Sequence, residues 1–145
     1  MGAVTHYIEV HAPVQACYDW WRNLTRLPEI MTDVRQVTTR RGHPDITDWE
    51  VAGPMGSTLE WTARIVEEAS PRKISWSTVG DGDDVASRGA VSFVDKGRGL
   101  TGVEIQLEYS PPVGKVGEVI AAIFDDPQSK VEQAAVEFKT LIEAR

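Results

Sequence analysis

Hydrophobic and polar residues alternate at the start of the chain, which is the pattern of a β-strand with one buried face. The residues that share one parity are Val4, His6, Ile8 and Val10. This period of two predicts a strand over about residues 4–10. Pro13 follows, and a proline suits the first turn of a helix because the N–H that it lacks would be unpaired there in any case.

The helix expected after Pro13 has one apolar face, on which its two adjacent tryptophans fall differently. Apolar residues recur at the i, i+3, i+4, i+7 spacing of a single face, at Val14, Cys17, Tyr18, Trp21 and Leu24. Trp21 is therefore predicted to belong to the core. Trp20 lies about 100° away at the edge of this stripe. It either widens the stripe or is exposed, at a surface, at a cavity lip or in a protein interface.

A second short helix is expected in the segment TRLPEIM, with Thr25 as its N-cap. The period then changes to two, and turn residues separate the apolar runs. Six strands are expected at about 33–41, 45–53, 57–68, 72–79, 86–95 and 100–110. One face of each strand is apolar and the other is charged, which predicts an antiparallel sheet with only one face buried. The short turns favour a meander.

After the segment SPPVG the period returns to 3.6. Two apolar stripes follow, nearly in phase, at Val116, Val119, Ile120, Ile123 and Phe124, and then at Val131, Ala134, Ala135, Phe138, Leu141 and Ile142. Asp126 and Pro127 lie between the stripes, where a proline kinks a helix and an Asp-Pro pair also begins one. The sequence therefore predicts either one kinked helix from about 113 to 144 or two helices meeting at residues 125–127.

This C-terminal segment is the only one long enough to cover the apolar face of the sheet. A twisted sheet curls around a helix, but a narrow helix fills the curl along only part of its length. The prediction is a curved seven-stranded antiparallel sheet around a long C-terminal helix, with two short helices after the first strand. A gap between these elements is the candidate for a binding site.

Composition limits the classes of function. With 145 residues the chain is expected to form one domain, 1–145. A net charge of −7 argues against nucleic acid as a partner. Without a long apolar run or a secretion signal, we expect a cytoplasmic protein with no stable membrane insertion. One cysteine, and histidines without ligand spacing, give no reason to expect a metal site.

Several segments resemble the polyketide cyclase/dehydrase branch of the START-like (helix-grip, SRPBCC) superfamily. They are APVQACYDWWRNLTRLPEIM, WEVAG, LEWTARIVEEASPRKISW and GAVSFVDKGRGLTGVEIQLEY. The most specific positions are Pro13, Tyr18, Asp19, Trp21, Pro28, Met31, Trp61 and Trp76. The resemblance implies an α+β helix-grip fold with a deep, mostly apolar cavity between the sheet and the long helix. Family members usually have a polar residue at position 20, so Trp20 is a departure.

Three tryptophans in the predicted strands are candidates for a cavity wall. Trp49, Trp61 and Trp76 are each in phase with the apolar face of their strand, and neighbouring strands would bring the rings onto one concave surface. Core packing explains them equally well, whereas large flat rings also suit an aromatic ligand. The full set of candidate ligand-binding residues is Trp49, Trp61, Trp76, Thr78, Phe93, Tyr109, Ile120 and Phe124.

Catalytic residues are harder to assign, because the sequence contains no convincing acid–base dyad. His6 and Tyr109 are the candidates. Cys17 lies on the core face of the first helix, where a thiol behaves as a small hydrophobic group. Arg88 is out of phase with the apolar residues of its strand and is expected to face water.

The leading hypothesis is that the cavity binds a hydrophobic, aromatic or polyketide-like molecule. The resemblance extends this to cyclisation or dehydration, as in aromatase/cyclases, by holding the chain in a reactive shape without a cofactor. One alternative is a lipid or quinone carrier with an apolar lip, for which Trp20, Pro111, Pro112 and Val113 are candidates. Another is a protein-interaction module whose cavity is filled by its tryptophans. A monomer and a homodimer are both compatible with the sequence.

Overall fold

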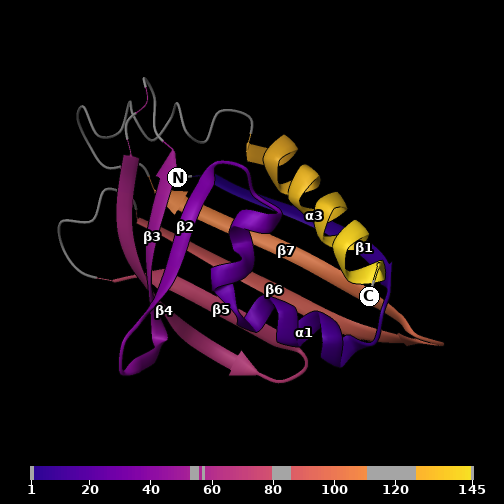
Figure 1. The fold of residues 1–145 in the computed structure, drawn as a ribbon. Coiled ribbons are helices and arrows are strands. Elements are labelled where there is room, and N and C mark those ends of the chain that lie inside the picture. Colours follow the sequence, from indigo (N-terminus) through magenta and orange to yellow (C-terminus); the bar gives the residue numbers. More distant parts are fainter. Residues whose placement is uncertain (1, 53–55, 57, 80–85, 111–126, 145) are drawn as a thin grey trace.

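The computed structural model describes residues 2–52, 56, 58–79, 86–110 and 127–144, which form a curved sheet with helices on its concave side (Figure 1). Within these ranges seven strands pair in the order β1-β7-β6-β5-β4-β3-β2, and every pair is antiparallel. Their bounds are β1 (Gly2–His11), β2 (Val34–Arg40), β3 (His43–Ala52), β4 (Thr58–Ala69), β5 (Lys73–Thr78), β6 (Ala86–Gly97) and β7 (Leu100–Ser110). Strands β2 to β7 therefore form the predicted meander, and β1 joins its far edge.

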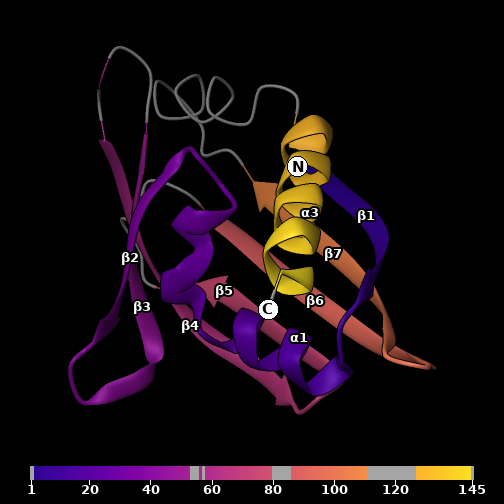
Figure 2. The same ribbon diagram turned by 45° about the vertical axis from the view of Figure 1, so that its right-hand side comes forward.

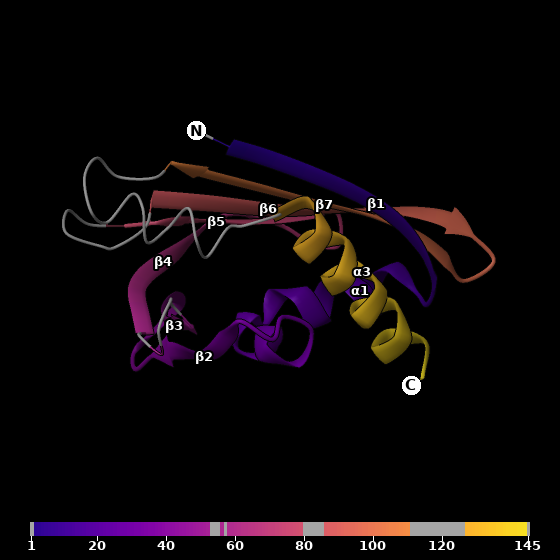
Figure 3. The ribbon, with the colours of Figure 1, turned by 90° about the horizontal axis from the view of Figure 1, so that it is seen from above.

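The alternation of apolar and polar residues determines which face of the sheet is buried. In β4, Leu59, Trp61 and Ala63 are buried, whereas Glu60 and Arg64 are exposed. Seen from above, the sheet bends at β4, so that β3 and β2 turn back toward the helices instead of continuing the plane of β5 to β1 (Figure 3). The bend brings the apolar faces of both parts of the sheet around one core.

Two short helices follow β1 and lie inside this bend. The first, α1, covers Val14–Arg22, and a 3-10 helix, η1, covers Leu24–Glu29. The prediction that Thr25 is the N-cap of the second helix is wrong, because η1 already begins one residue earlier. The Thr25 hydroxyl instead donates a hydrogen bond to the Asn23 side chain at 2.6 Å. From the end of η1 the chain enters β2.

The C-terminal helix, α3, covers Pro127–Glu143 and packs against β1 on the concave side of the sheet (Figure 2). Its buried residues belong to the second predicted apolar stripe and are Val131, Ala134, Ala135, Phe138 and Ile142. The first predicted stripe, within residues 113–126, lies outside the described residues, so the choice between a kinked and a broken helix stays a prediction. None of the helices in the described ranges is long and apolar enough to span a membrane.

Side chains of α3 also cover the free edge of β1, where unpaired backbone groups would otherwise be available to another strand. The Lys139 ammonium donates to the carbonyl of Glu9 at 2.9 Å. The backbone N–H of His11 donates to Glu143 Oε2 at 2.7 Å, and Lys139 pairs with the same carboxylate at 2.8 Å. α3 therefore covers part of the core and also shields one edge of the sheet.

Both tryptophans of the adjacent pair in α1 are buried. Each of the two side chains is only 1% exposed. Trp21 is therefore in the core as predicted, and Trp20 widens the apolar stripe, which was one of its two predicted alternatives. The other alternative, that Trp20 lies at a surface, a cavity lip or an interface, is wrong. The Phe138 ring lies 5.1 Å from Trp20 and 5.6 Å from Trp21, measured between ring centroids. The Arg26 guanidinium lies 5.3 Å from the Trp20 ring. Residues outside α1 therefore bury Trp20, whose position the apolar pattern of the helix alone did not determine.

Because Trp20 is buried as deeply as Trp21, we expect Trp20→Ala to lower the free energy of unfolding by about 3–5 kcal/mol. Urea unfolding followed by circular dichroism measures this change. Val136→Ala, at a position of α3 that is 54% exposed, is the control and should cost far less. A loss below about 1 kcal/mol for Trp20→Ala would mean that this side chain is exposed in solution.

Glu143 should make stability depend on pH in the acid range. Its pKa lies below the ordinary value of 4.5 because its carboxylate accepts the His11 N–H and pairs with Lys139. The unfolded chain therefore takes up this proton at a higher pH than the folded chain does. The stabilisation is fully present above about pH 4.5 and is lost as the pH falls through the lower pKa of the folded state.

We therefore expect Glu143→Gln to lower the free energy of unfolding at about pH 7, and to lower it less at an acid pH where Glu143 of the folded chain has taken up its proton. Urea titrations at the two pH values measure the difference. Glu137→Gln, on the same helix, is the matched control and should change the free energy of unfolding little. Equal losses for Glu143→Gln at both pH values would show that the carboxylate charge is unimportant.

Candidate functional site

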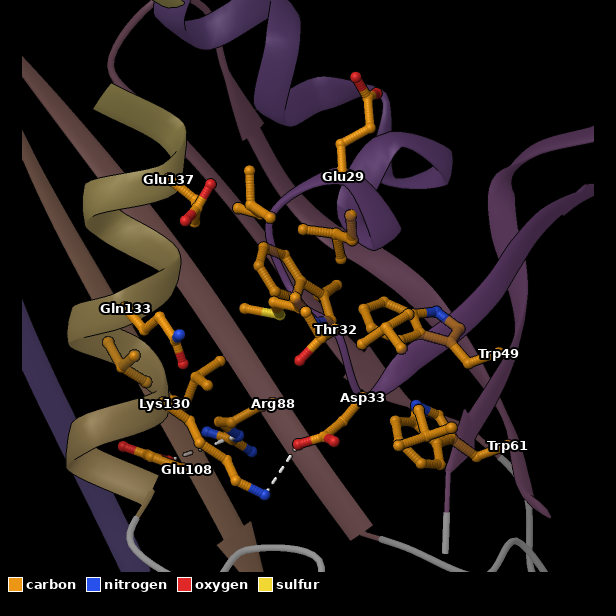
Figure 4. Close-up of a pocket in the computed structure, with 18 residues that line it drawn as sticks. Glu29, Thr32, Asp33, Trp49, Trp61, Arg88, Glu108, Lys130, Gln133 and Glu137 are labelled. Carbon is orange, nitrogen blue, oxygen red and sulfur yellow. Dashed lines mark ion pairs between the residues drawn. The ribbon is translucent and has the colours of Figure 1, made fainter. Parts of the chain in front are cut away.

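A cavity of about 440 Å³ lies on the concave side of the sheet (Figure 4). Its walls come from the η1–β2 connection, from β3, β4 and β5, from the facing ends of β6 and β7, and from α3. The volume falls in the range of about 300–1,000 Å³ that is typical of small-molecule sites. Trp20, Trp21 and Phe138 do not line it, so the cavity is separate from the cluster that these three rings form.

Three indole rings form one wall of the cavity. Trp49 and Trp61 are directly opposite each other in the β3–β4 register, with ring centroids 5.7 Å apart and planes only 22° apart. Trp49 also stacks with Trp76 of β5, with ring centroids 6.4 Å apart and planes 28° apart. The Trp49 indole N–H donates to the Thr47 hydroxyl at 2.8 Å, which fixes the orientation of the central ring. We call Trp49, Trp61 and Trp76 the indole wall.

A glycine in the neighbouring strand makes room for this wall. Gly89 in β6 lies directly opposite Trp76 in the β5–β6 register. A Cβ added at Gly89 would overlap the six-membered ring of Trp76, with its Cε2 atom only 2.5 Å away. Since nonbonded carbon atoms normally stay about 3.5–4 Å apart, only glycine at this position lets the Trp76 ring lie where it does.

The end of η1 and the start of β2 supply another apolar wall. Leu27 and Ile30 are buried and Met31 is half-buried, and all three line the cavity. The backbone N–H groups of Ile30 and Met31 both donate to the Leu27 carbonyl, at 3.0 and 2.9 Å, and Val34 N–H donates to the Met31 carbonyl at 3.2 Å. These bonds form a tight turn, which brings Asp33 to the rim of the cavity.

Two ion pairs border the cavity (dashed in Figure 4). Lys130 Nζ on α3 lies 2.8 Å from Asp33 Oδ2, next to the start of β2. Arg88 Nε and Glu108 Oε2, which face each other across β6 and β7, are 3.8 Å apart. All four side chains are between 43% and 69% exposed, so each pair contributes only about 0–1 kcal/mol to stability. Their main effect at the rim is that their charges largely cancel.

Two further polar side chains of α3 border the cavity. Gln133 and Glu137 are four residues apart, which places them on one face of the helix, and both extend from α3 toward the cavity (Figure 4). Neither forms a hydrogen bond or an ion pair with any described residue. They lie across the cavity from Trp49, so the cavity has an aromatic side and a polar side.

The structure places the predicted ligand-binding residues in different surroundings. The three tryptophans all line the cavity. Phe93 is buried elsewhere and meets the Tyr18 ring edge-on, with centroids 5.9 Å apart. Thr78 is half-buried and is not part of the lining. The candidate side chains outside the described part of the chain are those of Tyr109, Pro111, Pro112, Val113, Ile120 and Phe124.

The other residues weighed for chemistry lie away from the cavity or are exposed. His6 does not line it, and its Nδ1 lies 4.0 Å from Glu132 Oε1 on α3. Cys17 is fully buried, and this burial raises the pKa of its thiol, as suits a small hydrophobic group. Arg88 is 69% exposed, as predicted. No cluster of His, Cys, Asp or Glu within the described ranges could hold a metal ion.

Sequence reasoning missed the polar residues of the rim. Lys130, Gln133 and Glu137 each precede a buried residue of the apolar stripe in α3, so the pattern alone reads them as solvent-facing. Asp33 follows a short helix and looks like an ordinary strand start. The sequence shows these residues of α3 only as a polar row directly beside the apolar stripe. This row can be recognised as part of a cavity rim once the η1–β2 connection is placed across from α3.

Comparison with known proteins gives a family match for most of the chain. The family described as "Polyketide cyclase / dehydrase and lipid transport" matches residues 10–136. An uncharacterised 17.2 kDa protein of Streptomyces lincolnensis is 29% identical over 147 aligned residues, which cover 100% of this chain and 92% of that protein.

Solved structures show the same fold at low sequence identity. The Zhui aromatase/cyclase from Streptomyces sp. R1128 is 15% identical, with a TM-score of 0.73 over 99% of this chain and 96% of the other. A START superfamily protein from Mycobacterium smegmatis is 16% identical, with a TM-score of 0.69 over 98% and 97% of the two chains. At such identities the likeness establishes the curved-sheet fold and leaves the ligand open.

Since the Trp76 ring occupies the space beside Gly89, we expect Gly89→Ala to lower the free energy of unfolding by about 1–3 kcal/mol. Trp76→Leu removes the overlapping ring, so the double variant should lose less than the sum of the two single losses. Urea unfolding of the four proteins measures the coupling. Phe93→Leu combined with Gly89→Ala is the control and should be additive. If the losses of Gly89→Ala and Trp76→Leu are also additive, the Trp76 ring does not occupy the space beside Gly89.

Proposed function

The chain belongs to the polyketide cyclase/dehydrase and lipid transport family, and from this premise we propose that its cavity binds a flat hydrophobic small molecule of aromatic or polyketide-like structure. The family makes a hydrophobic ligand the expected one. The indole wall is the basis of the finer proposal that this ligand is flat, because a planar ring system can continue a stack of nearly parallel rings.

Binding is better supported than catalysis. The described lining contains no histidine or cysteine, and of the two candidate catalytic residues His6 lies outside the cavity. Tyr109 has a side chain outside the described part of the chain. If a reaction does occur here, cyclisation or dehydration of a polyketide-like chain would depend mainly on the shape in which the walls hold it.

The other two hypotheses receive less support. A carrier that delivers lipid or quinone needs an apolar lip. Trp20, the one lip candidate among the described residues, is buried under Phe138, and Pro111, Pro112 and Val113 lie outside those residues. A protein-interaction module with a vestigial cavity would have its tryptophans filling the space. Instead about 440 Å³ remains open beside the three rings.

The binding proposal predicts a ligand preference that depends on the indole wall. We expect the neutral planar fluorophore 2-acetyl-6-dimethylaminonaphthalene to bind with a blue shift in its emission. The neutral chain 1-decanol should compete poorly, because a flexible chain gains less from stacked rings. Trp61→Leu and Trp76→Leu should each weaken fluorophore binding by roughly tenfold, since the variant loses the flat contact surface and keeps an apolar side chain.

Phe93→Leu is the matched control, because it also shortens a buried aromatic residue of the sheet but lies outside the cavity lining. It should leave the dissociation constant unchanged. Thermal unfolding of each variant verifies that the protein is folded at the titration temperature. Displacement of the fluorophore by 1-decanol at a lower concentration than by naphthalene would instead favour the lipid carrier.

A further inference from the structure

We propose that Glu137 selects among aromatic ligands by the polar group that they present at the cavity rim, favouring a neutral hydrogen-bond donor such as a hydroxyl and disfavouring a carboxylate. This inference rests on the proposed function, because it requires an aromatic ligand in the cavity. It adds the residue that recognises the polar edge of the ligand and the chemical class of that edge.

The argument begins with the two sides of the cavity. Trp49 and Trp61 present their rings on one side, while Gln133 and Glu137 extend from α3 on the other (Figure 4). A planar ligand that extends from the indole wall across the cavity brings its far edge, or a substituent on that edge, toward α3. Whatever polar group lies there meets the two side chains of α3 that have no partner among the described residues.

Glu137 differs from the other charged residues of the described lining because its carboxylate is in no ion pair with a described residue. The other ionised residues of the lining are already in ion pairs, which are Lys130–Asp33 at 2.8 Å, Arg88–Glu108 at 3.8 Å and Arg26–Glu29 at 2.8 Å. Within the described lining this leaves the carboxylate of Glu137 as the uncompensated charge. The described part of the rim therefore carries one uncompensated negative charge, on a chain whose net charge is −7.

The chemistry of a carboxylate decides which ligand group fits. An ionised carboxylate accepts hydrogen bonds and donates none. A ligand hydroxyl can donate to it and form a charge-assisted bond, which is stronger than a bond between two neutral groups. A ligand carboxylate can offer no donor and also meets a like charge. Gln133, with both a donor and an acceptor, can bind a second polar group beside the hydroxyl.

Three probes with the same ring system separate these effects. Naphthalene has no polar group, 2-naphthol carries a neutral donor at neutral pH, and 2-naphthoate carries an anion. Titration of each into the 15N-labelled full chain, followed by NMR, gives three dissociation constants. We expect the order of affinity to be 2-naphthol, then naphthalene, then 2-naphthoate.

Substitution of Glu137 should change this selectivity without abolishing binding. Glu137→Ala removes the acceptor, so the preference for 2-naphthol over naphthalene should fall by about fivefold. Glu137→Gln keeps the size and removes the charge, so the affinity for 2-naphthoate should rise relative to naphthalene. Glu132→Ala and Glu132→Gln are the matched controls, since Glu132 is on the same helix but faces His6, and they should leave all three ratios unchanged.

The possible outcomes test the two proposals separately. If the probes bind and the Glu137 variants keep the parent ratios, the selectivity inference is overturned while the aromatic cavity stands. Tightest binding of 2-naphthoate to the parent would also overturn the inference, because Lys130 would then dominate recognition. If neither the probes nor the fluorophore binds the parent chain, the proposed function fails and this inference fails with it.

Discussion

The packing of one ring, Phe138, against both Trp20 and Trp21 is the contact on which the rest of the structure depends. A sheet with a single apolar face must be covered, and here α1 and α3 share the cover. Phe138 joins the two helices, with centroid distances of 5.1 and 5.6 Å to the two indoles. The core is solid at this junction. Because α3 is held there and along β1, the bent-back part formed by β2, β3 and β4 faces an opening, and this opening is the cavity.

The sequence predicts the parts of this arrangement that depend on local periodicity. Alternation places Trp49, Trp61 and Trp76 on the buried face of their strands, and a meander makes those strands neighbours. The sequence therefore predicts that the three rings lie close together. The register, in which Trp49 lies opposite Trp61, confirms this for that pair. Gly89 provides the space that the Trp76 ring needs. The glycine is visible in the sequence, but its role becomes clear only from the β5–β6 register, which places it opposite Trp76.

Features that depend on contacts between distant segments could not be predicted in this way. The burial of Trp20 is decided by Phe138, far along the chain, and by Arg26, so the pattern within α1 leaves it undecided. The polar rim depends on α3 lying across from the η1–β2 connection. Within α3, Glu137 is an ordinary solvent-facing position. Only the fold turns it into part of a site, because local periodicity carries no information about which segment lies opposite.

Under the proposed function, the two sides of the cavity have different physical roles in recognising a ligand. Apolar rings that border open space lack partner atoms on one side and lose the dispersion contacts that a filled interior provides. A planar guest restores those contacts, whatever its substituents, so the indole wall supplies affinity with little discrimination. Discrimination between ligands would then come from the rim, where Glu137 has no partner among the described residues. Its carboxylate would gain from a ligand hydroxyl and would repel a ligand carboxylate. Rim residues are exposed and contribute little to stability, so they can change without disturbing the junction at Phe138, and one fold can therefore accommodate different ligands.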